Sequence, residues 1–152
     1  MKKSWFDEHR ELMSRMEETR RYKHWISFHW TAFQFTVGTK TVTRRLWPDS
    51  YAKRFKVGDT VGACDKMLFR GGRPIGACKI FSKELEALDR IVTDPEYGRR
   101  EMAKEGFPGM APTEFIRRFF GKSRKHRPDG KVWRVEFERV DWLGHEPLGL
   151  GN

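Results

Sequence analysis

The segment at residues 38–47, GTKTVTRRLW, combines hydroxyl and cationic side chains at a spacing that could support chemistry. Lys40, Arg44 and Arg45 supply positive charge, and Thr43 supplies a hydroxyl between them. If the segment is extended, alternation places Lys40 and Thr43 on opposite faces, whereas in a turn the two side chains can converge. A basic segment between a strand and a helix can also bind phosphate. A solvated basic strand edge is the alternative interpretation.

Further basic and aromatic residues extend this candidate site. Trp47 offers a ring on which a nucleobase could stack. A second basic run at residues 122–127, KSRKHR, predicts an exposed loop that follows phosphates, with a merely solvated loop as the alternative. The expected nucleic-acid-binding residues are Arg44, Arg45, Trp47, Lys53, Arg124, Lys125 and Arg127.

The chain carries a strong positive charge. Its 152 residues include 31 Lys and Arg against 21 Asp and Glu, a formal net charge of +10, with a pI near 9.9. A small domain needs a charge of only about 2 to 8 for solubility, so the excess favours a polyanionic partner. The sequence has no apolar run of about 18 residues, signal peptide or lipidation motif, which predicts a cytoplasmic protein without a membrane partner. The oligomeric state is left open.

Cysteine and histidine spacing does not indicate a metal site. Cys64 and Cys78 lie 14 residues apart within apolar runs, so we expect two buried free thiols. The five histidines form no H-x-x-x-H pair, and no Walker loop, G-x-S-x-G motif or dinucleotide fingerprint occurs. We therefore predict no metal and no cofactor.

Apolar periodicity predicts an α+β fold with one core, because the chain is long enough and 38% hydrophobic. Helices are expected at residues 4–23, 48–55, 84–88, 95–105 and 112–121. Strands are expected at residues 25–30, 60–67, 75–81 and 132–140, while residues 31–37 fit either a helix or a strand. The expected aromatic core residues include Phe55, Phe81, Phe115, Phe119 and Phe137. Strands mixed with short helices, without regular βαβ alternation, favour a curled or closed sheet.

Five segments follow one another in a recognisable order: ISFHW, GTKTVTRRLW, YAKRFKVGDTV, KEGFPGMAPTEFIRRFF and VWRVEFERV. Over residues 25–142 this order and spacing resemble the ASCH domains of the PUA-like superfamily. The resemblance implies a small PUA-like β-barrel with short helices over a cleft, at residues 24–143. An N-terminal helical extension at residues 1–23 and a flexible tail at residues 144–152 lie outside it.

The resemblance also implies a function. ASCH domains are related to RNA-binding domains, some are amidohydrolases that remove the acyl group from N4-acetylcytidine, and another is a single-strand ribonuclease. Their amidohydrolase residues, carried over by motif, fall on Lys40, Thr43 and Glu105, the last with a gap. We expect an RNA-binding protein whose basic cleft accepts a nucleobase or a nucleoside, and hydrolysis is the alternative.

The chemistry of such a trio is coherent. Burial and the nearby arginines would lower the pKa of Lys40, which could then accept the proton of Thr43. Glu105 could pass that proton to the leaving amine. In the non-catalytic interpretation Lys40 binds phosphate, Thr43 stabilises a turn, and Glu105 pairs with Arg99 or Arg100.

Overall fold

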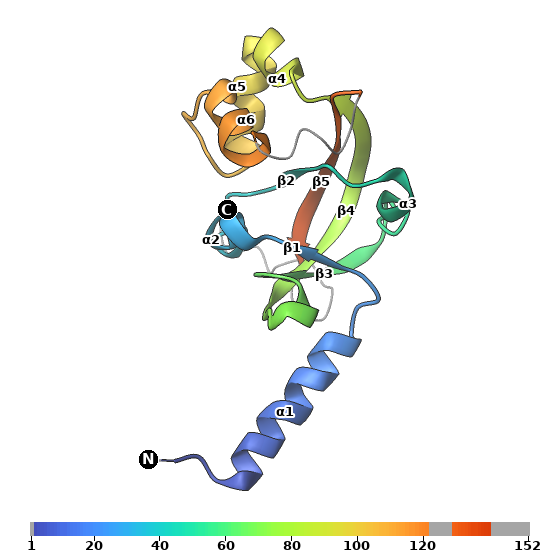
Figure 1. Ribbon diagram of the computed structural model, residues 1–152, viewed down its shortest axis with the longest axis vertical. Helices are drawn as coiled ribbons and strands as arrows, with labels where there is room; N and C mark the ends of the chain where they lie inside the picture. The colour runs from blue at the N-terminus through green and yellow to red at the C-terminus, as the bar shows by residue number, and fades with distance from the viewer. Residues whose placement is uncertain (1, 122–128, 141–152) are drawn as a thin grey trace.

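The protein is an α+β domain built on one five-stranded mixed sheet (Figure 1). The computed structural model describes residues 2–121 and 129–140. The strands are β1 (Trp25–Ser27), β2 (Val42–Arg45), β3 (Thr60–Cys64), β4 (Pro74–Ala87) and β5 (Lys131–Val140). Their order across the sheet is β1-β3-β4-β5-β2. β1 is parallel to β3, and the other neighbouring pairs are antiparallel.

The described residues also form helices, most of which flank this sheet. They are α1 (Trp5–Arg20), α2 (Ala32–Thr36), α3 (Asp49–Ala52), α4 (Arg90–Thr93), α5 (Pro95–Lys104) and α6 (Pro112–Phe120), with 3-10 turns η1 (His29–Thr31) and η2 (Leu68–Arg70). Helices α4 to α6 gather at one end of the long strands β4 and β5, and α1 projects away from the opposite end (Figure 1). The start of α5 is fixed by the Asp94 side chain, which accepts a hydrogen bond from the backbone N–H of Tyr97.

The expectation of a closed barrel is wrong. Strands β1 and β2, of three and four residues, form the two edges of the sheet and do not pair with each other. The two edges nevertheless approach each other, because the guanidinium of Arg45 on β2 donates to the carbonyl of Ser27 on β1 at 2.6 Å. The sheet is therefore curled, and a side chain bridges its opening.

Several element predictions need correction. Residues 84–88 were expected as a helix, but residues 84–87 belong to β4 and pair with β5, because the cross-strand ladder outweighs the helix propensity of Glu and Leu. Phe81 is 52% exposed rather than in the core, since it is the extra residue where the β4–β5 register shifts between Ile80 and Ser82. The strand expected at residues 25–30 ends at Ser27, and residues 32–36 are helical.

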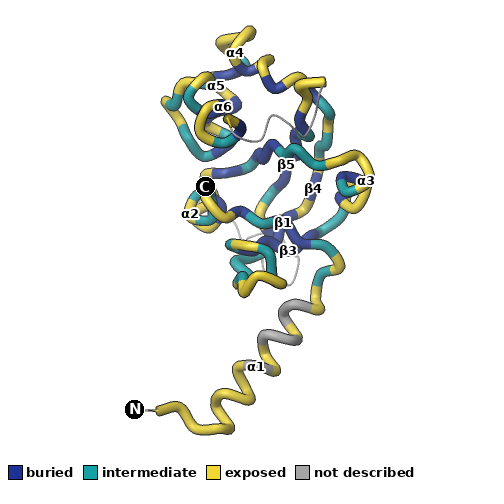
Figure 2. The backbone as a smooth tube through the Cα atoms, in the orientation of Figure 1, coloured by how far each residue is buried: buried dark blue, intermediate teal, exposed yellow. Residues whose placement is uncertain are grey.

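Two separate apolar clusters form the core. The sheet cluster lies inside the curled sheet and comprises Ile26, Phe28, Phe35, Phe55, Val61, Ala63, Cys78, Ile80, Val135 and Phe137. The helix cluster lies under α4 to α6 and comprises Leu88, Ile91, Met102, Phe115, Ile116, Phe120 and Val132. Figure 2 shows these buried stretches, and shows that the described residues of α1 are exposed. Cys64 and Cys78 are buried and free, as predicted.

Candidate functional site

A cavity of about 280 Å³ opens between the two edge strands of the sheet. The residues that line it are Ser27, Phe28, His29, Trp30, Thr31, Lys40, Thr43, Arg44, Arg45, Leu46, Glu105, Phe115, Phe119 and Phe120. Lys40, Thr43 and Glu105, which the sequence placed in one site, all border this cavity. Its remaining walls are mostly aromatic, from the end of β1 on one side and α6 on the other. We refer to it below as the edge pocket.

Backbone contacts fix Lys40 before β2 begins. Gly38 takes a left-handed conformation (φ 83°) that ends α2 and turns the chain. The N–H of Lys40 then donates to the carbonyl of Gln34 at 3.1 Å, and the N–H of Thr41 donates to the carbonyl of Lys104 at 2.7 Å. The second bond joins this segment to the last residue of α5. Lys40 is therefore held where α5 ends.

Glu105 meets Lys40 at that position. The Lys40 Nζ lies 2.6 Å from Glu105 Oε1 and also donates to the Glu105 carbonyl, and each side chain is 2% exposed. Gly106 follows with a positive φ of 97°, and a Cβ there would lie 2.7 Å from the Cβ of Gln34. Only a glycine allows the chain to pass this close while placing Glu105 beside Lys40.

Arg44 is buried in an ionic network rather than exposed to a ligand. Its guanidinium donates to Glu86 Oε1 and Glu105 Oε2 at 2.9 Å each and also contacts Glu101. The Arg44 side chain is 0% exposed. Arg134 donates to the same Glu101 carboxylate from β5. Three carboxylates already occupy this guanidinium, so the expected contact between Arg44 and nucleic acid stays a prediction, although Arg44 is among the residues that line the edge pocket.

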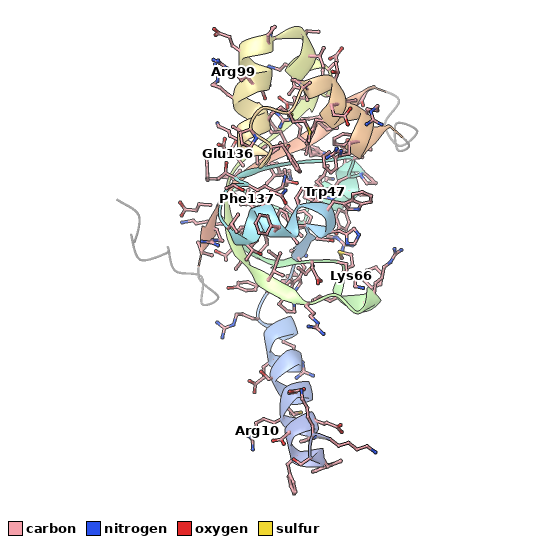
Figure 3. The ribbon with its side chains drawn as sticks, turned by 90° about the vertical axis from the view of Figure 1, so that its left-hand side faces the viewer. Arg10, Trp47, Lys66, Arg99, Glu136 and Phe137 are labelled. Carbon is pink, nitrogen blue, oxygen red and sulfur yellow. The ribbon has the colours of Figure 1, made fainter. Side chains whose placement is uncertain are left out.

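The alternative partners proposed for Glu105 lie elsewhere. Arg99 and Arg100 are exposed on α5, and Figure 3 shows Arg99 on the outer side of this helix. Glu105 pairs with Lys40 and Arg44 instead. The non-catalytic interpretation therefore named the wrong ion-pair partners for Glu105.

Lys40 shares its carboxylate with a second cation. Both Lys40 and Arg44 donate to Glu105, whereas Arg134 pairs with Glu101 and Glu136. Burial, and then the nearby Arg45 and Arg44, lower the pKa of Lys40, although Glu105 opposes this. Because arginine does not lose its proton in proteins, Lys40 is the cation that can become neutral.

Arg45 is the cation that faces the pocket without a carboxylate partner. Its Nε donates to Thr43 Oγ1 at 2.9 Å, and its guanidinium lies 5.4 Å from the ring centre of Phe28. Within residues 2–121 and 129–140 it forms no ion pair. Alternation along β2 explains this difference, because Thr43 and Arg45 face the pocket while Arg44 faces the network. The pocket therefore attracts anions or electron-rich groups.

The remaining predicted residues lie apart from the pocket. The Trp47 ring stacks on Phe55 with centroids 4.4 Å apart and also contacts Tyr51, and the residue is partly buried (Figure 3 labels Trp47). Its role in base stacking stays a prediction. Lys53 follows α3 and lines a different surface groove. Arg124, Arg127 and Lys125 lie outside the described residues.

Trp30 was not identified from the sequence as a site residue. Its side chain is 73% exposed at the pocket mouth, where it follows β1 in η1. The apolar pattern of residues 25–30 predicted a strand at this position. The sequence signal for a helix here was the spacing of Trp30, Phe33 and Val37 at i, i+3 and i+7. In the structure all three side chains are exposed. Three apolar residues at this spacing were too few to distinguish a helix from a strand.

No protein-family model, curated protein or solved structure matches this chain. In the described part of the chain, no helix is long and apolar enough to cross a membrane. The same residues contain no group of three or more His, Cys, Asp or Glu side chains placed to hold a metal ion.

Acid should destabilise the protein through Glu101. Burial opposes its ionisation, but hydrogen bonds from Arg134 and the charge of Arg44 lower its pKa from 4.5 to about 2. A carboxylate with a lowered folded-state pKa stabilises the fold above pH 4.5, and this stabilisation is lost as the pH falls toward 2. We expect a loss of about 3 kcal/mol in the free energy of unfolding from this group.

Urea unfolding between pH 7 and pH 2.5 measures this loss. The free energy of unfolding of Glu101→Gln should depend less steeply on pH than that of wild type, because about one proton fewer is taken up on unfolding. Glu114→Gln is the matched control, because Glu114 forms an ion pair at the surface and its replacement should leave the profile almost unchanged. Identical profiles for wild type and Glu101→Gln would contradict the assignment.

Proposed function

We propose that this protein is an RNA-binding protein of the ASCH type, and that its edge pocket receives a single nucleobase. The observation that carries the proposal is the pairing of an aromatic wall with Arg45, a cation that forms no ion pair in the described part of the chain. Aromatic side chains stack on bases, and unpaired cations attract phosphate. The net charge of +10 acts in the same direction.

The size and polarity of the pocket favour a base over other ligands. At about 280 Å³ it lies at the lower limit of ligand pockets, which suits one flat ring system. Its buried polar groups, Lys40, Thr43 and Glu105, can donate to and accept from the edge of a base.

The convergence of the trio supports the ASCH assignment. Lys40 and Glu105 are 65 residues apart in the chain, yet they form a direct ion pair beside Thr43 at one cavity. The motif resemblance requires this meeting, while composition and periodicity do not. A curled sheet with helices over a cleft is also what a PUA-like domain requires, so this finer fold assignment is part of the same proposal.

Trp30→Ala tests the binding function. Stacking of a base on an aromatic ring contributes about 1 to 3 kcal/mol, so this change should weaken the binding of single-stranded RNA by about 5- to 150-fold. Because Trp30 is largely exposed, the fold should be unaffected. Fluorescence anisotropy of a labelled RNA measures the affinity. Phe69→Ala is the matched control, since Phe69 is 77% exposed but belongs to η2. Equal losses in both variants would argue against the pocket.

Hydrolysis of an acylated cytidine is the second candidate function, favoured by the hydrogen bonding of Thr43. Its Oγ1 accepts from Arg45 Nε, so its own proton is free to be donated, and the cation stabilises the oxygen as it loses that proton. Lys40, whose pKa is lowered by burial although Glu105 opposes this, lines the same pocket and is the proposed acceptor of that proton. Formation of cytidine and acetate from N4-acetylcytidine by the purified protein would support this candidate. Release of short products from single-stranded RNA would favour a ribonuclease instead.

A further inference from the structure

We propose that a second, cationic groove binds the phosphate backbone of the RNA strand whose base enters the edge pocket. This inference deepens the proposed function and rests on it. The groove has a volume of about 570 Å³ and lies between the start of β1 and the turn after α3. The residues that form it, with Thr60 and Val61 at its base, are Lys23, His24, Lys53, Arg54, Lys56 and Asp59.

The cations of this groove have no carboxylate partners. Lys23, Lys53, Arg54 and Lys56 are exposed, and none forms an ion pair with a residue in the described part of the chain. Asp59 contributes the groove's single negative charge. Four cations that repel one another around one hollow are stabilised when an anion binds. A phosphate strand suits them because each neutralised phosphate also releases counterions.

Contacts with the sheet cluster hold the groove in shape. The Arg54 guanidinium lies 4.8 Å from the ring centre of Tyr51, which in turn packs on Phe55. On the opposite wall the His24 ring meets the edge of Phe55, and the His24 carbonyl accepts from the backbone of Gly62. Both walls therefore rest on one buried ring. An ordered cation loses less conformational entropy when it binds a ligand.

The groove and the edge pocket lie along the same pair of chain segments. His24 stands at the start of β1 and Ser27 at its end, and three residues of strand span about 10 Å. Arg45 at the pocket leads through residues 46–48 into α3, which ends beside Lys53. In Figure 1, α3 lies on the side where β1 begins, and β1 leads toward α2. One strand of several nucleotides can therefore contact both sites.

The concave shape favours a nucleic-acid strand over a membrane surface. The cations stand on two walls, from residues 23–24 and from residues 53–56. A strand of phosphates can enter between such walls, whereas a flat layer of lipid headgroups contacts projecting side chains. Binding to anionic lipid is therefore an outcome that the experiment must separate.

The test compares two triple variants with the same change in charge. The groove variant is Lys53→Gln, Arg54→Gln and Lys56→Gln. The control variant is Lys66→Gln, Arg70→Gln and Arg73→Gln, which changes exposed residues around η2. Each is assayed by anisotropy against a labelled 12-nucleotide single-stranded RNA and a trinucleotide, over a salt series, and by sedimentation with vesicles containing phosphatidylserine.

The groove variant should bind the 12-nucleotide RNA at least about tenfold more weakly than the control variant does. For the groove variant the slope of log affinity against log salt concentration should be shallower by about 2, since each lost phosphate contact removes about 0.7 from the slope. The preference for the long RNA over the trinucleotide should fall in the groove variant alone. Circular dichroism establishes that both variants are folded.

Three results would overturn the inference, and they are distinguishable. If both variants match wild type on the long RNA while Trp30→Ala weakens binding, the groove fails and the proposed function stands. If wild type binds neither RNA, both proposals fail. If the groove variant loses vesicle binding but keeps its RNA affinity, the groove serves a lipid surface instead.

Discussion

Replacing Arg44 with methionine should lower the free energy of unfolding by about 3 to 5 kcal/mol, the largest stability effect expected in this protein. The Arg44 side chain fills a fully buried position and donates to carboxylates of Glu86, Glu101 and Glu105. Methionine approximates its shape but donates nothing. Removing one partner of a buried ionic group leaves the opposite charges without compensation, and here three carboxylates are affected at once.

Urea denaturation at pH 7, followed by circular dichroism, measures this effect. Arg117→Met is the matched control, because Arg117 pairs with Glu114 at the surface, where solvent screens the pair and its loss should change the free energy of unfolding little. Arg44→Lys retains the charge but not the planar fork, so it should also be clearly destabilised. If Arg44→Met does not fold, the free energy of unfolding of Arg44→Lys can still be measured and tests the same prediction. Similar losses for Arg44 and Arg117 variants would show that the network is not as buried as described.

Replacing Lys40 with methionine should have the largest effect on function if the protein hydrolyses N4-acetylcytidine. In that reaction Thr43 Oγ attacks the acetyl carbon as its proton passes to Lys40. The carbon–nitrogen bond then breaks, with a proton delivered to the leaving amine, and water hydrolyses the threonine ester to acetate. Without Lys40 the hydroxyl loses the base that this mechanism assigns to it, so we expect kcat to fall by about a thousandfold or more.

Chromatographic measurement of released cytidine tests this prediction. Thr43→Val should lose activity as fully as Lys40→Met, because the two residues act in one step. Lys104→Met is the control, since Lys104 pairs with Glu136 outside the edge pocket. The rate should rise with pH as Lys40 loses its proton, and should level off below the ordinary lysine pKa of 10.5. Full activity of Lys40→Met would remove the lysine from the mechanism.

The motif resemblance predicted which residues lie near one another better than how their side chains are oriented. Lys40, Thr43 and Glu105 do border one cavity. Arg44 and Arg45, however, are chemically identical neighbours whose roles depend on which face of β2 meets α5. That choice is made by Glu86 and Glu101, which lie far along the chain, so no local pattern in GTKTVTRRLW contains it.

Aromatic residues show the same limit. Trp47 ends the basic motif, but its ring stacks on Phe55 and does not line the edge pocket, whereas Trp30 lies at the pocket mouth. Proximity along the chain cannot show which ring remains uncovered after packing. The fold was also predicted unevenly. The amphipathic α6 was predicted within one residue of its end, while residues 84–87 became a strand through pairing with β5.

The position of the ionic network between the two apolar clusters affects how the molecule moves. Glu86, Glu101 and Arg134 lie where the sheet cluster ends and the helix cluster begins, so the two hydrophobic units meet through charged groups. Partial opening of a protein occurs most readily where few apolar contacts must be separated. We therefore expect an opening of the molecule to begin at this charged boundary. Since α6 supplies one wall of the edge pocket and β2 another, such an opening would widen the entrance. The proposed ligand would then enter and leave at a rate that depends on the strength of the ion pairs.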